Sequence, residues 1–230
     1  MPFLHLHCMK DTSVSDMEAS AIAETAGIPL GALRSARPFE APVPSAALDG
    51  VSGLLIGGSA WSVFEEIPCY DAFVALLHEA RRRRLPMFGI CFGAQAIAHV
   101  FGGRVVRDHD RAEYGTIDVH REDDVDDLFA ELPLRFRAQA WHQDRIVQLP
   151  AGAAAAAWSQ DAVLQAFAFR DAPIWGVQFH PERTRETFEK LLETRPAPCE
   201  AHPIERIRAS LVPTPRAASL LARFVRYAQR

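Results

Sequence analysis

The part of the sequence best suited to chemistry is a cysteine set between two glycines, in the segment GICFGAQ (89–95). The apolar residues before Cys91 predict a buried strand, and helical periodicity begins directly after it, so the sulfur is expected at a strand-to-helix turn. A helix N-terminus stabilises negative charge and favours the thiolate. Glycines on both sides relieve crowding in a sharp turn of the nucleophile-elbow type. These features predict that Cys91 is a nucleophile, and a buried structural thiol is the alternative.

A base for this cysteine is predicted in the segment GVQFHPE (176–182). Residues 177–179 have the pattern of a strand, which places His180 at the strand end and Glu182 on the same face two residues later. Pro181 stiffens the link and stops the hydrogen-bond ladder. An imidazole oriented by a carboxylate can shuttle the proton of a nucleophile. Alone, a histidine near a glutamate is a common surface pair, but beside the cysteine turn it predicts a catalytic pair.

Backbone donors for a developing oxyanion are also predicted. The N–H of Phe92 follows the nucleophile directly, and the strand expected over 50–59 ends in the pair Gly57-Gly58. Without side chains, this pair lets the N–H of Gly58 point into a cleft. A simple turn is the alternative for the glycine pair.

The elements that position these residues follow from alternating apolar and helical patterns. A strand–helix–strand–helix order predicts right-handed crossovers and a mainly parallel sheet covered on both faces. The chain is therefore expected to have an α/β, three-layer, flavodoxin-like fold in a single domain over residues 1–230. Strands are predicted at 3–7, 50–59 and 85–90, followed by shorter strands with a hairpin around 171–173; helices are predicted at 16–27, 70–84, 94–103, 184–194 and 216–229.

Composition is sufficient for a packed core and indicates no charged macromolecular partner. The chain has 230 residues, 49% of them hydrophobic, and a formal net charge of −4, which gives no indication of nucleic-acid or membrane partners. The basic run 81–84 is expected to end a helix. We find no signal-peptide pattern and no apolar stretch of the ~20 residues that a membrane helix needs. The cysteines are scattered, which predicts a reduced cytoplasmic location; they are Cys8, Cys69, Cys91 and Cys199.

Two histidines near the N-terminus, His5 and His7, would share one face of the first strand. Such a pair can bind a metal ion, but no acidic residue lies near it in the sequence. The expectation is therefore that the protein has no metal site and needs no cofactor.

Three segments, LLIGGS (54–59), GICFGAQ and GVQFHPE, resemble in order and spacing the diagnostic segments of the class I glutamine amidotransferases. The likeness is closest to the amidotransferase domain of GMP synthase and its free-standing relatives. WHQDRIVQLP (141–150) and AEYGTIDV (112–119) look like two further segments of the family. One departure is Ser59, where many relatives have proline after the glycine pair.

The resemblance implies a role for each matching residue. Cys91 would be the nucleophile, His180 the general base and acid, and Glu182 the orienting carboxylate. The substrate would be held by Gln95 and by the backbone around Trp141 and His142, with Gly58 and Phe92 as oxyanion donors.

The implied reaction is hydrolysis of the glutamine side-chain amide through a cysteine thioester, which releases ammonia. The sequence has no P-loop and no second domain for an acceptor. A separate synthase subunit is therefore the expected partner. The alternative is a free-standing hydrolase acting on another γ-glutamyl small molecule.

Two other classes of protein fit less well. A cysteine α/β-hydrolase would carry its acid between nucleophile and histidine in the sequence, which is not the order here. A binding module that lost its activity would be expected to lose one of Cys91, His180 and Glu182.

Overall fold

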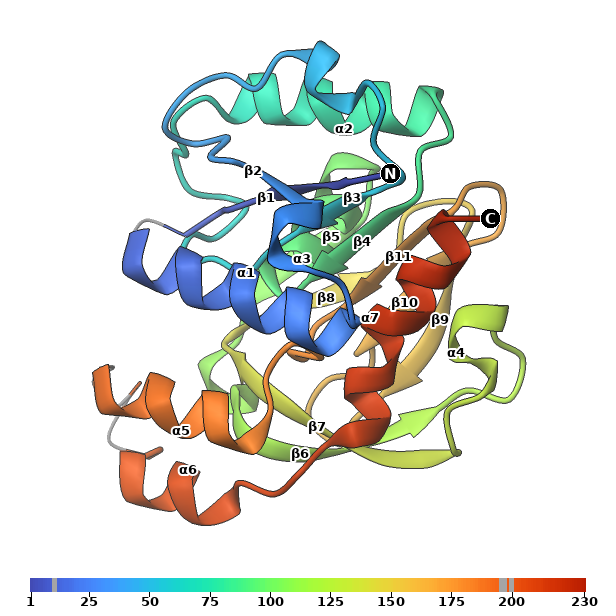
Figure 1. The fold of residues 1–230 in the computed structure, drawn as a ribbon. Coiled ribbons are helices and arrows are strands. Elements are labelled where there is room, and N and C mark those ends of the chain that lie inside the picture. The colour runs from blue at the N-terminus through green and yellow to red at the C-terminus, as the bar shows by residue number, and fades with distance from the viewer. Residues whose placement is uncertain (10–11, 195–197, 199–200) are drawn as a thin grey trace.

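A nine-stranded sheet organises the chain in the computed structural model, which describes residues 1–9, 12–194, 198 and 201–230 (Figure 1). Pairing is parallel from β2 through β1, β3 and β4 to β11, and antiparallel from β11 to β7. In spatial order the strands are β2 (Leu33–Ala36), β1 (Phe3–Leu6), β3 (Leu54–Ile56), β4 (Met87–Ile90), β11 (Ile174–Val177), β10 (Ala166–Phe169), β9 (Ala153–Trp158), β6 (Glu113–Arg121) and β7 (Arg135–His142). A separate antiparallel pair joins β5 (Arg104–Arg107) to β8 (Asp144–Gln148).

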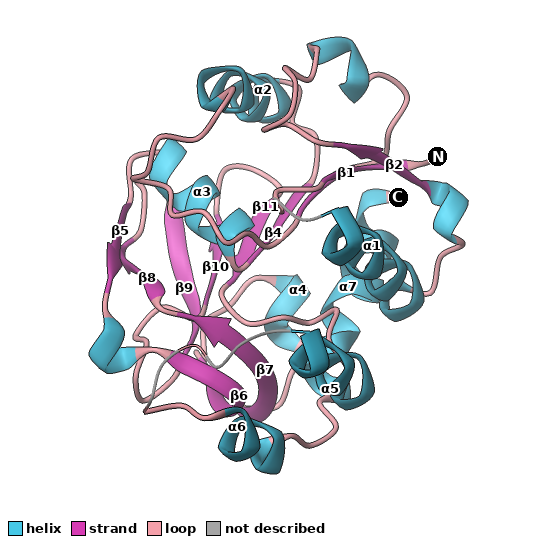
Figure 2. Cartoon of the chain, turned by 90° about the vertical axis from the view of Figure 1, so that its left-hand side faces the viewer, coloured by secondary structure: helices cyan, strands magenta, loops and turns pink. Residues whose placement is uncertain are grey.

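Helices cover both faces of the parallel half of the sheet (Figure 2). On one side lie α1 (Thr12–Ala26) and α7 (Pro215–Ala228), and on the other lie α2 (Tyr70–Arg82) and α3 (Phe92–Val100). The strands β1, β3 and β4 are buried along their whole length, which is why their sequences are nearly continuous apolar runs. The predicted three-layer α/β architecture is confirmed. Three shorter helices are α4 (Asp127–Ala130), α5 (Arg185–Thr194) and α6 (Ile204–Ser210).

Each helix layer is held to the sheet by its own apolar cluster. Phe224 of α7 packs against Phe3 of β1 and Phe88 of β4, at ring-centroid distances of 5.9 and 5.4 Å. On the opposite face, Phe73 of α2 and Phe92 of α3 both contact the ring of Phe39. Burial of these rings supplies much of the free energy that joins the layers.

The predicted elements differ from the observed ones in a few places. The strand expected over 50–59 is regular only at Leu54–Ile56, although the Gly57 N–H still donates to Leu6 O at 3.1 Å. The helix α6 lies in the proline-rich stretch that we expected to be a connection. Hairpin pairing of β10 and β11 is confirmed, and the alanine run 153–157 belongs to β9. In the described part of the chain, no helix has the length and apolar character needed to cross a membrane.

The basic run 81–84 ends α2, as predicted, and each of its first three arginines faces a carboxylate. Arg82 and Arg83 both reach Glu79, at 2.7 and 2.6 Å, and Arg81 reaches Asp171 at 3.0 Å. The run is therefore largely balanced by acidic side chains from its own helix and from the β10–β11 turn.

Two glycines let the start of α3 approach β3 and β4 more closely than any other residue would. A Cβ on Gly93 would overlap the carbonyl oxygen of Ile56, and a Cβ on Gly89 would lie within 2.6 Å of the backbone nitrogen of Ala94. Both neighbours are main-chain atoms in regular elements, so they cannot move aside cheaply. The spacing of the two glycines around Cys91 thus follows from backbone packing.

We predict that Gly93→Ala destabilises the fold by at least about 1–3 kcal/mol, because the new methyl group forces β3 and α3 apart. The measurement is the free energy of unfolding in denaturant. Gly31→Ala is the matched control, since its Cβ would meet no atom within 4 Å, and it should change stability by no more than about 1 kcal/mol. Equal stability of the two variants would contradict the packing argument.

Candidate active site

Cys91 forms the turn between β4 and α3 in a strained backbone conformation. Its φ of 51° and ψ of −104° lie outside the regions that side chains normally allow. Two hydrogen bonds hold it there: its N–H donates to Val177 O at 2.8 Å, and its carbonyl accepts from the Gln95 N–H at 3.0 Å. The residue is only 6% exposed, yet it borders two cavities. The predicted strand-to-helix turn is confirmed.

His180 and Glu182 form a close pair beside this cysteine. The Nδ1 of His180 lies 2.7 Å from Glu182 Oε1, and the carboxylate is fully buried. We expected the two residues to share one face of a strand, but β11 ends at Val177, so the pair lies in the loop beyond the strand. The His180 N–H donates to Gln139 O at 2.8 Å, which ties this loop to β7. His180 shares a small cavity with Cys91.

The charges around His180 favour the imidazolium. Burial alone would lower the pKa of His180, but the attraction of the Glu182 carboxylate and of Cys91 raises it from 6.5 to about 10. The imidazole side chain keeps 13% of its surface exposed, so water reaches part of it. Arg183 Nε lies 3.4 Å from Glu182 Oε1 and shares the negative charge. The buried carboxylate therefore favours the charged form of His180 and holds its ring in place.

The glycine pair at the end of β3 receives a carboxylate from α1. The N–H of Gly58 donates to Glu18 Oε1 at 2.8 Å, and a Cβ on Gly57 would overlap the Glu18 carboxylate. Glu18 is 1% exposed and lines the same small cavity as Cys91 and His180. Burial would raise the pKa of Glu18, but His5, the Gly58 N–H and Arg183 together lower it. The N–H that we predicted as an oxyanion donor is therefore occupied by a carboxylate from the same chain.

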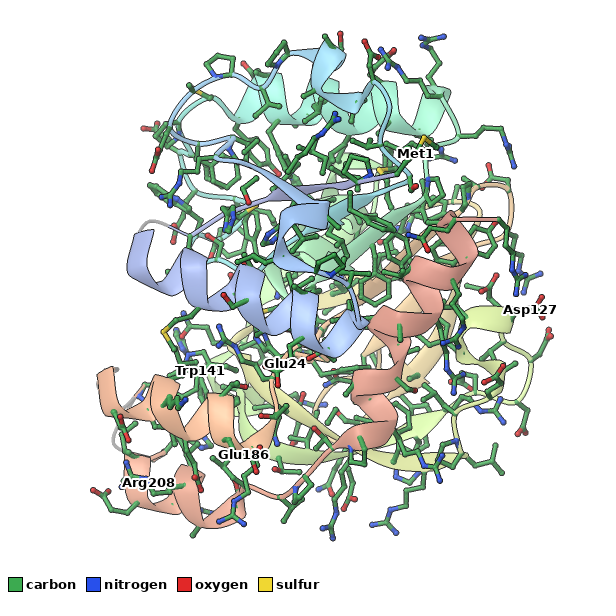
Figure 3. The ribbon with its side chains drawn as sticks, viewed as in Figure 1. Met1, Glu24, Asp127, Trp141, Glu186 and Arg208 are labelled. Carbon is green, nitrogen blue, oxygen red and sulfur yellow. The ribbon has the colours of Figure 1, made fainter. Side chains whose placement is uncertain are left out.

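A second cavity, of about 320 Å³, opens from Cys91 towards β7 and the start of β8. Its lining contains the three predicted substrate contacts, Gln95, Trp141 and His142. The carbonyl oxygen of Trp141 lies 3.8 Å from Cys91 Sγ. The indole ring of Trp141 packs against Phe188 of α5, and Figure 3 shows Trp141 beside this helix. The structure thus brings all three residues to one cavity beside the sulfur.

The polar groups of these three residues have different partners. Gln95 Nε2 donates to Asp144 O at 2.8 Å, and it also reaches Gln178 Oε1 at 3.3 Å. The Nε2 of His142 lies 3.1 Å from Glu113 Oε2, so this ring turns towards a buried carboxylate. Both side chains are therefore engaged with the protein.

Sequence reasoning missed two charged residues of this region, Glu18 and Arg183, and gave no role to Asp144 of the segment 141–150. Glu18 lies four residues before Ile22 on the apolar stripe of α1, and a carboxylate on such a stripe is the signal that could have identified it. The buried Asp144 binds Ser62 and receives a hydrogen bond from Arg107 Nε at 3.0 Å. Cys199, the fourth cysteine, lies outside the described residues.

We predict that Glu182→Gln lowers the pKa of His180 from about 10 towards its ordinary 6.5, because the neutral amide cannot stabilise the imidazolium. The folded-state pKa is raised, so the stabilising effect of charged His180 is complete below pH 6.5 and disappears as pH rises through 10. An NMR titration of the His180 ring reports the pKa, and denaturation at several pH values reports the stability. Glu189→Gln, which removes a surface ion pair with Arg185, is the control. An unchanged His180 titration in Glu182→Gln would contradict the electrostatic assignment.

Comparison with known proteins agrees with this geometry. Residues 23–195 match the family model described as glutamine amidotransferase class-I. The GMP synthase [glutamine-hydrolyzing] of Borreliella burgdorferi (strain N40) is 31% identical over 160 residues, which cover 69% of this chain and 30% of that protein.

Solved structures share the fold over nearly the whole chain. A glutamine amidotransferase from Thermotoga maritima superposes with a TM-score of 0.76 at 21% identity, covering 99% of this chain and 97% of its own. A candidate GMP synthase subunit from Thermoplasma acidophilum gives a TM-score of 0.67 at 22% identity, with coverage of 100% and 98%. With three quarters of its length matched by the family model, the chain belongs to the class I glutamine amidotransferases.

Proposed function

We propose that the chain is a single glutaminase domain over residues 1–230, which hydrolyses the side-chain amide of glutamine through a thioester on Cys91. The observation that carries this proposal is the 2.7 Å pair of His180 and Glu182 beside a cysteine held in a strained strand-to-helix turn. A nucleophile, a base and an orienting group in one site are the elements of covalent acyl transfer. No cofactor is required for this chemistry.

In the first step, the Cys91 thiolate attacks the amide carbon of glutamine. The imidazolium of His180 gives its proton to the departing nitrogen, so that ammonia leaves and a γ-glutamyl thioester forms. In the second step, neutral His180 accepts a proton from water, which attacks the thioester and releases glutamate. Glu182 keeps Nδ1 of the ring engaged throughout and stabilises each imidazolium state.

The oxyanion of each tetrahedral intermediate needs backbone donors. Phe92 begins α3, where the first N–H groups have no partner within the helix. The N–H of Gly58 can join it once Glu18 turns away, because one N–H cannot bind both a carboxylate and an oxyanion well. The proposed reaction therefore includes a movement of Glu18 relative to Gly58.

Substrate would lie in the cavity of about 320 Å³ that opens from Cys91. Gln95, Trp141 and His142 line it, as the family resemblance implies for substrate contacts. The carbonyl of Trp141, close to the sulfur, is suited to accept a hydrogen bond from the α-amino group of glutamine.

A synthase that consumes the ammonia is the proposed partner. The chain spans about 30% of the length of the Borreliella burgdorferi GMP synthase that it matches. A separate synthase subunit would supply the activity of the part of that protein that this chain does not match.

Cys8, Cys69 and Cys91 are free thiols, which supports the predicted cytoplasmic location.

We predict that Cys91→Ala lowers the rate of glutamine hydrolysis by at least about 10³-fold, since no other group forms the thioester. Ammonia release measures the rate, and circular dichroism checks the fold. Cys69→Ala is the control, because Cys69 has a similarly positive φ of 57° but lies at the start of α2. A glutamine-analogue diazo-ketone should label Cys91 and no other cysteine. Unchanged ammonia release by Cys91→Ala would exclude the nucleophile assignment.

The choice of substrate is tested with the purified wild-type protein on glutamine and on a panel of γ-glutamyl compounds. We expect glutamine to be the best substrate, and its turnover to rise when the synthase partner binds. The partner itself would be found by pull-down from native extract. High activity on the panel without any partner, together with weak activity on glutamine, would instead establish a γ-glutamyl hydrolase.

A further inference from the structure

Two histidines and a glutamate meet beneath the active site, and the proposed reaction uses none of them as catalyst. His5 and His7 project from the same face of the first strand and its extension, with ring centroids 4.1 Å apart. Glu18 of α1 faces them, and its Oε2 lies 3.4 Å from His5 Nε2. One donor atom from each of the three residues lies within 4.8 Å of the others. The acidic partner that the sequence did not reveal for the histidine pair comes from α1.

The cluster is almost completely buried, with exposures of 0%, 4% and 1% for His5, His7 and Glu18. Buried polar atoms normally have hydrogen-bond partners. Among the residues that the structure describes, three of these atoms have no hydrogen-bond partner: both ring nitrogens of His5 and the Oε2 of Glu18. The approach of these two groups is 3.4 Å, between His5 Nε2 and Glu18 Oε2. Buried ligand atoms that face one another at such a distance are suited to share a bound ion.

One positive side chain and one backbone donor act on Glu18. Arg183 interacts with its charge, but this guanidinium also lies 3.4 Å from Glu182 and is shared with it. Glu18 Oε1 is already bound to the Gly58 N–H, which fixes the carboxylate and turns Oε2 towards the histidines. A carboxylate that binds a metal is often oriented by a hydrogen bond to its other oxygen, and the Gly58 N–H supplies such a bond to Glu18.

We propose that His5, His7 and Glu18 form a binding site for a divalent transition-metal ion of the zinc class, with water completing the coordination. Two imidazoles and one carboxylate are a common zinc ligand set. In a tetrahedral site of this kind the ligand atoms are roughly 3.3 Å apart, so the His5–Glu18 distance of 3.4 Å already fits.

A pocket borders one of the three residues. His7 lines a large cavity of about 770 Å³ between α1, β2 and residues 37–47, and this cavity contains none of the catalytic residues. Glu18 lines the small cavity that holds Cys91 and His180. The site therefore lies between this large cavity on one side and the proposed catalytic centre on the other. A bound ion would hold Glu18 at Gly58 and so bear on the oxyanion donor.

The test is a titration of chelator-treated wild-type protein with Co²⁺, followed by the visible d–d absorption of the ion. We expect saturation at one equivalent per chain, displacement by Zn²⁺, and no sulfur-to-metal charge-transfer band. Failure to saturate would overturn the proposal. A charge-transfer band would also overturn it, because the ion would then lie on a cysteine such as Cys91.

Variants identify the ligands. His7→Gln and Glu18→Gln should each weaken Co²⁺ binding at least about 10-fold, whereas Glu24→Gln, an exposed position on the same helix, should not. Zn²⁺ should raise the melting temperature of the wild type and of Glu24→Gln only. If a ligand variant fails to fold, X-ray absorption of the wild-type Zn²⁺ form decides: two imidazoles support the site, and a sulfur ligand refutes it. Neither readout depends on glutaminase activity.

Discussion

The close approach of the α3 start to the end of β3 is the constraint on which the site depends. Gly93 lies against the carbonyl of Ile56, and Gly89 lies against the first turn of the helix. No residue with a side chain fits at either place, so the chain between them must turn sharply. Cys91 takes up this turn with a positive φ, and its sulfur is thereby directed beyond the carboxyl ends of the parallel strands. Packing of backbone against backbone thus determines where the proposed nucleophile stands.

Electrostatics adds a second level of organisation to the same place. Three charged side chains that follow β11, His180, Glu182 and Arg183, are largely buried and lie in contact. Each alone would be costly to bury, and together they compensate one another. The order along the chain matters because consecutive residues of one loop cannot separate far. The carboxylate that stabilises the imidazolium is therefore a near neighbour of His180 in the sequence. The loop that carries both residues follows β11, the strand next to β4, and so lies beside Cys91.

Most of this architecture was predictable from sequence, because strands buried on both faces and helices with one apolar stripe leave strong patterns. The turn at Cys91 and the pairing of His180 with Glu182 were predictable for a different reason, since each lies within a few residues of chain. The contact between Glu18 and Gly58 was not predictable, because the two residues are 40 positions apart and neither segment carries a signal for the other. The strand register brings β1 and β3 together, and only this pairing places α1 over the glycine pair.

In the proposed reaction, the Gly57-Gly58 pair has two uses that compete for one N–H. Glycine is required for an N–H to meet an oxyanion in the cleft, and it is equally required for the Glu18 carboxylate to lie against the backbone. A negative carboxylate at this position disfavours a second negative charge on the substrate oxygen. Formation of the proposed oxyanion hole is therefore linked to whatever determines the position of Glu18. The two histidines that face its other oxygen, His5 and His7, are the groups placed to exert that control.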